Sequence, residues 1–136
     1  MSASDPMLFS QRIAQICLFL AGAIAVFGGT LQMYLGQPET SPRLDNVHRF
    51  MGGIYLMSGV IGLWVAATIR QHNTLVFLLA LTVFVGGIGR LISISKVGLP
   101  EPSAVWLGYL VPELVLPWII IAAQIVTNRA ISGAPN

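Results

Sequence analysis

Four long apolar runs constrain this chain more than any other feature of its sequence. Each run holds roughly the 20 consecutive, mostly apolar residues that a helix needs to cross the hydrocarbon core of a bilayer. The runs are residues 13–35, 50–69, 75–94 and 104–126. Within lipid the backbone must satisfy its own hydrogen bonds, which a helix does. We therefore predict an all-α fold, an integral membrane four-helix bundle that forms one membrane domain over residues 1–136, with both termini on the same side.

Composition supports this class and argues against several others. Charged residues make up only 9% of the chain, whereas they make up about a quarter of a typical soluble domain. The seven basic residues are scattered singly, so the sequence has no patch that would bind nucleic acid. The single cysteine, Cys17, excludes an internal disulfide, and His48 and His72 belong to opposite ends of the predicted bundle, which argues against a metal or haem site. Nucleotide-binding and hydrolase motifs do not occur, and we predict no cofactor and no catalytic residue.

The connecting segments define the two ends of the bundle. Residues 70–74 form a connection so short that the second and third spans must be antiparallel neighbours, whereas residues 36–49 and 96–103 are longer and contain prolines. We call the end with the short connection and both termini the turn end, and the end with the two proline-containing segments the loop end. Basic residues near the membrane boundary number three at each end, so the positive-inside rule is balanced. We expect the termini in the cytoplasm.

Two opposite charges fall inside the apolar runs and are the strongest sign of a polar site. Arg90 lies about five residues from the loop end of the third run, and Glu113 about eight residues from the loop end of the fourth. At about 1.5 Å per residue their depths are roughly 8 and 12 Å, a difference that an arginine side chain can bridge. Because an unpaired charge at this depth is costly, we predict that the two side chains pair. The pair has two interpretations, a structural ion pair or part of a ligand- or proton-handling site.

Prolines and small residues surround this pair. Pro112 and Pro117 each remove a backbone hydrogen bond in the fourth run, which predicts kinks and freed carbonyls on both sides of Glu113. In the third run, helical spacing puts several small or polar residues on one face with Arg90. We expect this face to contact other helices, because small residues let helices approach closely in lipid. These residues are Thr82, Gly86, Gly89 and Ser93.

The approach to the second run adds polar residues at the loop end. Asp45 or Asn46 is suited to cap the helix, and His48 and Arg49 follow in its first turns. One interpretation is anchoring at the membrane interface, with Arg49 reaching lipid headgroups. The other turns Arg49 inward toward the ion pair, and gives a net-positive pocket for an anionic headgroup or a carboxylate. The predicted ligand-binding residues are Arg49, Arg90, Glu113, His48 and Asp45.

Several of these residues also carry a resemblance to a known family. The motifs are Leu44-Asp45-Asn46-x-x-Arg49-Phe50-x-Gly52-Gly53, Gly86-Gly87-x-Gly89-Arg90-Leu91-x-Ser93, Gly98-x-Pro100 and Glu113-Leu114. They resemble the pattern of the small bacterial four-helix membrane proteins grouped as domain-of-unknown-function family 4345. The resemblance implies a four-helix fold in a bacterial inner membrane, and it points to Arg49, Arg90 and Glu113 as characteristic polar positions without naming a ligand. In helix number and size the chain is also similar to the DoxX-like membrane proteins, a likeness of fold that carries no function.

Three functions fit these features. The first, which we favour, is a binding or accessory subunit with a polar intramembrane pocket, whose partners are the lipid bilayer and a lipid or small anionic ligand. The second is a proton-coupled transporter or membrane enzyme that uses Glu113 as its proton carrier, although four spans make a thin pathway. The third is a scaffold subunit in a homo-oligomer or a larger membrane complex. The sequence favours a non-enzymatic role.

Overall fold

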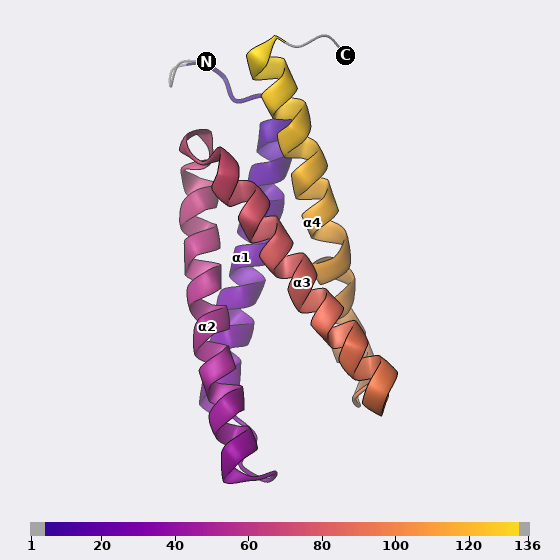
Figure 1. Ribbon diagram of the computed structural model, residues 1–136. Helices are drawn as coiled ribbons and strands as arrows, with labels where there is room; N and C mark the ends of the chain where they lie inside the picture. The colour runs from indigo at the N-terminus through magenta and orange to yellow at the C-terminus, as the bar shows by residue number, and fades with distance from the viewer. Residues whose placement is uncertain (1–4, 134–136) are drawn as a thin grey trace.

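Four long helices make up the fold. The computed structural model describes residues 5–133, and its elements are α1 (Phe9–Leu35), α2 (Pro42–Ala67), the short 3₁₀ helix η1 (Ile69–Gln71), α3 (Asn73–Val97) and α4 (Ser103–Ser132) (Figure 1). Each α-helix is long and apolar enough to cross a membrane. The prediction of an all-α, four-span membrane fold is thereby confirmed, and the chain is a multi-pass membrane protein. Residues 1–4 and 134–136 of the predicted domain lie outside the described residues.

Helix α2 begins earlier than its apolar run suggested. Its first residue is Pro42 rather than Phe50, and the hydroxyl of Ser41 accepts a hydrogen bond from the backbone N–H of Leu44 at 3.2 Å. Serine is a favoured N-cap, and proline suits the first helical position because its missing N–H would have no partner there. This local start signal outweighs the polar composition of residues 42–49. Ser41 therefore caps the helix, and the expectation that Asp45 or Asn46 does so is wrong.

Glycines bring α1 and α2 into close contact along much of their length. A Cβ atom added at Gly29 would lie 2.7 Å from the carbonyl oxygen of Gly52, and one added at Gly59 would lie 2.8 Å from that of Gly22. Neither distance leaves room for a side chain. Such contacts between small residues are a main source of helix association in lipid, where apolar side chains gain little by leaving the tails. The two helices therefore form a tightly packed pair.

The buried core lies toward the turn end, where all four helices meet. Its central members include Leu18 of α1, Val65 of α2, Val76 of α3 and Ile120 of α4, all of them fully or almost fully buried. At the same end, the side-chain oxygens of Ser10 and Thr127 lie 2.7 Å apart and join α1 to α4. Away from this end, α2 and α3 diverge toward the loop end (Figure 1). The molecule thus consists of two helix pairs, α1 with α2 and α3 with α4, that are held together mainly at the turn end.

Helix α3 rests on α4 through a different glycine from those expected. A Cβ atom at Gly87 would lie 2.9 Å from the side chain of Leu114, whereas one at Gly86 or Gly89 would meet nothing within 4 Å. The expectation that Gly86 and Gly89 contact other helices is therefore wrong. The reason is that α3 leans away from α2, so only the face that carries Gly87 reaches a neighbour.

Candidate functional site

A cleft lies between the two helix pairs and is lined by residues of all four α-helices. Its volume is about 630 Å³, within the range of pockets that bind small molecules. On α1 the lining residues run from Leu18 to Leu35, a length of roughly 26 Å at 1.5 Å per residue. Most of the lining is apolar, with Leu18, Leu79 and Leu116 at its deeper end. The cleft is therefore long, mostly apolar and open on one side.

The ion pair predicted from depth lies in the wall of this cleft. Arg90 Nε of α3 donates to Glu113 Oε2 of α4 at 2.7 Å, and both residues line the cleft. The Glu113 side chain is only 10% exposed and that of Arg90 is 31% exposed. The carboxylate is thus buried against its partner, while the Arg90 side chain stays partly exposed. A buried charge needs such a partner, because the desolvation cost is otherwise several kcal/mol.

Two aromatic rings of α4 hold the guanidinium in place. The Cζ atom of Arg90 lies 5.7 Å from the ring centroid of Trp106 and 5.5 Å from that of Tyr109. These distances are in the range of favourable cation–π contacts, which are strongest away from water. Neither aromatic residue is among the ligand-binding residues predicted from the sequence, where both fit interface or packing aromatics better, yet a signal existed. Trp106, Tyr109 and Glu113 are spaced three and four residues apart, so they share one face of α4.

Several hydrogen-bond donors around Arg90 have no partner in the part of the chain that the structure describes. Among residues 5–133, no hydrogen bond is made by the terminal nitrogens of Arg90, the indole nitrogen of Trp106 or the hydroxyls of Tyr55 and Tyr109. All four side chains line the cleft. Polar groups that the protein itself leaves unsatisfied at membrane depth require another partner, since lipid tails offer none.

Gly28 of α1 makes space for the two tyrosines. A Cβ atom added there would lie 3.0 Å from Cε1 of Tyr55 and 4.0 Å from Cε1 of Tyr109. The rings, which come from α2 and α4, therefore approach α1 at one level of the cleft. This level is also that of Arg90, because its guanidinium contacts the Tyr109 ring. Residues from both helix pairs thus converge on one polar cluster, which we define as Tyr55, Arg90, Trp106, Tyr109 and Glu113.

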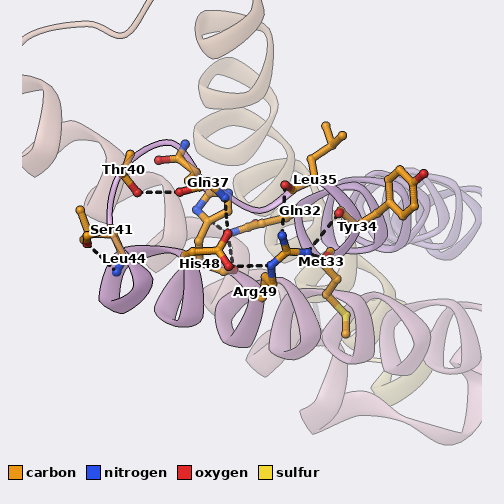
Figure 2. A network of polar contacts seen from close by, with 11 residues as sticks. Gln32, Met33, Tyr34, Leu35, Gln37, Thr40, Ser41, Leu44, His48 and Arg49 are labelled. Atoms are coloured by element: carbon orange, nitrogen blue, oxygen red, sulfur yellow. Dashed lines mark hydrogen bonds and ion pairs between the residues drawn. The ribbon is translucent and has the colours of Figure 1, made fainter.

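Arg49 lies in the first turns of α2 beside the end of α1 (Figure 2), and neither it nor its partner Asp45 lines the cleft. Arg49 Nε donates to Asp45 Oδ2 at 2.9 Å, and Arg49 Nη1 donates to the carbonyl oxygens of Met33 and Tyr34 at 2.6 and 3.1 Å. The last carbonyls of a helix lack intrahelical partners and carry partial negative charge. Arg49 therefore caps α1, and the interpretation that it turns inward toward the ion pair is not what the structure shows. The carbonyls of α1 are the nearer acceptors.

His48 occupies the loop end of the cleft. Gln32 Nε2 of α1 donates to the backbone carbonyl of His48 at 3.0 Å and lies 3.4 Å from its Nδ1 (Figure 2). The imidazole is thereby held between α1 and α2. Of the five predicted ligand-binding residues, the structure thus puts Arg90, Glu113 and His48 in one cleft. Within residues 5–133 no three His, Cys, Asp or Glu side chains lie close enough together to hold a metal ion.

A family model described as "Domain of unknown function (DUF4345)" matches residues 13–124, which is most of the chain and includes every residue of the polar cluster. No curated protein and no solved structure matches the chain.

Proposed function

Because the chain belongs to the DUF4345 family, which brings no activity with it, we propose a function from the geometry: the protein binds an amphiphilic molecule of the bilayer in the cleft between its two helix pairs. The apolar length of the cleft holds the tail of this molecule, and the polar cluster holds its head. The protein acts as a binding or accessory subunit and carries out no reaction of its own.

The observation that carries this proposal is the combination of a long apolar wall with one polar cluster. An apolar groove alone would fill with ordinary lipid tails, and a buried ion pair alone would serve as a structural joint. Here the ion pair faces a cleft of about 630 Å³ and is surrounded by donors that have no partner among residues 5–133. Pockets of this kind, apolar with a few convergent polar groups, are typical of ligand sites.

Access from the membrane also supports binding of a bilayer component. Outside the turn end, α2 and α3 are far apart (Figure 1), and Tyr55 of α2 and Gly86 of α3 both line the cleft. A molecule moving within the bilayer would enter through this side without crossing the headgroup region. Its head would then reach Arg90, which lies below the end of α3 by about 10 Å at 1.5 Å per residue.

Proton transport through Glu113 has less support. Such a role needs a continuous series of polar or titratable side chains across the bundle. Toward the turn end, the cleft ends at a core of aliphatic side chains that includes Leu18, Val76 and Ile120. Glu113 therefore has a path to the cleft, and this aliphatic core separates it from the buried polar residues nearer the turn end, such as Gln15 and Gln124.

Blocking the cleft tests the proposal. Gly28→Leu would place a side chain against Tyr55 and fill the cleft at the level of the polar cluster, whereas the matched change Gly89→Leu adds the same bulk at an open position of α3 that does not line the cleft. We expect native mass spectrometry from mild detergent to show a bound amphiphile on the parent and on Gly89→Leu, and none on Gly28→Leu. Equal occupancy in all three proteins would contradict the proposal. Stoichiometric companion proteins without any bound amphiphile would favour the scaffold role instead.

A further inference from the structure

The charge balance of the polar cluster restricts the head that the cleft accepts. Arg90 and Glu113 contribute one positive and one negative charge at 2.7 Å. Arg49, the residue expected to make the pocket net positive, is bound to Asp45 and to the carbonyl oxygens of α1. The cluster with no ligand is therefore electrically neutral. An anionic head would add an uncompensated negative charge in a region where burying a charge is unfavourable, and a cationic head would add an uncompensated positive charge.

The balance of donors and acceptors restricts the head further. A guanidinium has five N–H donors, of which Arg90 uses one for Glu113, and the indole N–H of Trp106 and the hydroxyls of Tyr55 and Tyr109 add to the remaining ones. The acceptors of the cluster that are not also donors are the two carboxylate oxygens of Glu113, of which Oε2 already receives Arg90, and the backbone carbonyl of Glu113, which loses its helical donor to Pro117. The open donors outnumber these acceptors. A head with several acceptor oxygens and no donors would satisfy them.

Building on the proposed function, we infer that the cleft selects amphiphiles whose head is uncharged and rich in carbonyl-type acceptors, such as an ester, in preference to anionic amphiphiles. Such a head accepts hydrogen bonds from Arg90 Nη1 and Nη2 and from the tyrosine hydroxyls, while the Arg90–Glu113 pair stays intact. Glu113 then has a defined role, because it neutralises Arg90 and so excludes carboxylate and phosphate heads. It is a specificity-determining residue.

Three probes with the same chain length separate charge from hydrogen bonding. Methyl palmitate offers an uncharged ester, hexadecanesulfonate offers a permanently charged head, and hexadecane offers no head. Equilibrium binding of each tritiated probe to the purified protein in nanodiscs should show the ester binding at least about tenfold more tightly than either of the others, a factor that corresponds to about 1.4 kcal/mol.

Removing the negative charge should reverse this preference. In Glu113→Gln, which keeps the side-chain size, Arg90 loses its counter-charge, and we expect hexadecanesulfonate to bind about tenfold more tightly than it binds the parent. The matched control Glu39→Gln, at an exposed carboxylate in the α1–α2 connection, should bind all three probes as the parent does. Should Glu113→Gln fail to fold, the neutral double variant R90M/E113Q takes its place, and its preference for the ester over hexadecane should weaken because only the tyrosine and tryptophan donors remain.

The outcomes separate this inference from the proposed function. If no probe binds the parent, the proposed function itself is wrong. If all three bind the parent equally, or the sulfonate binds best, the cleft binds amphiphiles but the inferred selectivity is wrong. If Glu113→Gln keeps the preference of the parent, Glu113 does not determine the specificity.

Discussion

Removing either partner of the Arg90–Glu113 pair should lower the free energy of unfolding, and the loss should be larger when Arg90 is removed than when Glu113 is removed. Removing one partner of a fully buried pair costs about 3–5 kcal/mol, whereas an exposed pair is worth about 0–1 kcal/mol. The Glu113 side chain is 10% exposed and that of Arg90 is 31% exposed. Arg90→Met leaves the more deeply buried charge without its cation, so we expect a loss of about 3–4 kcal/mol. Glu113→Gln leaves a charge that still has the rings of Trp106 and Tyr109, so we expect only about 2 kcal/mol.

A double-mutant cycle measures the coupling directly. The parent, Arg90→Met, Glu113→Gln and R90M/E113Q are unfolded in mixed micelles of a mild detergent and dodecyl sulfate, and the free energy of unfolding is taken from tryptophan fluorescence. We expect the double variant to be more stable than the two single losses predict, by about 2 kcal/mol, because it leaves no unpaired charge. Glu39→Gln serves as the control for loss of a carboxylate. A coupling below about 0.5 kcal/mol, or a larger loss for Glu113→Gln than for Arg90→Met, would refute this account of the pair.

Three further predictions concern the frame of the cleft. Gly29→Ala should lower the free energy of unfolding by about 1–3 kcal/mol, because its Cβ meets the backbone of α2. The neighbouring Gly28→Ala should change it by less than about 1 kcal/mol, because only the Tyr55 ring must shift. Similar losses for the two variants would contradict the close α1–α2 contact. Arg49→Met should lower the free energy of unfolding by about 1–2 kcal/mol, a loss limited by the 39% exposure of the Arg49 side chain. It should also speed amide exchange in the last turn of α1 and leave probe binding unchanged. Weaker probe binding would show that Arg49 is part of the ligand site. Gly89→Ala, at an open helical position, should stabilise the monomer by up to about 1 kcal/mol. A lower stability, or a smaller oligomeric fraction on a size-exclusion column, would show that a partner covers this face.

The spans and the ion pair were predictable because they depend on length and depth alone. An apolar run of span length has one solution in lipid, and two opposite charges at similar depth on neighbouring spans attract strongly. Arg90 and Glu113 needed only that information. The face of α4 that carries Trp106 and Tyr109 was readable in the same way, from spacing along one helix.

The other features depend on how the helices tilt and pack, which no local pattern encodes. Arg49 binds the end of α1 because Gly36, at φ 57°, turns the chain so that α2 runs back beside that end, and the sequence does not show this turn. Gly86 and Gly87 are adjacent in sequence, and the lean of α3 decides which of them meets α4. The cleft is a product of the same lean and therefore appears only once the helices are placed together.

The uneven packing along the bundle gives its two halves different mechanical properties. Interlocked side chains at the turn end fix the four helices there, whereas at the loop end the pairs have little to resist a small change in the angle between them. We expect the two helix pairs to pivot about the turn end, so that the cleft accepts tails of different width. The contacts that keep the protein folded would stay in place during this motion. Such a pivot would also respond to bilayer thickness, which links occupancy of the cleft to the membrane in which the protein resides.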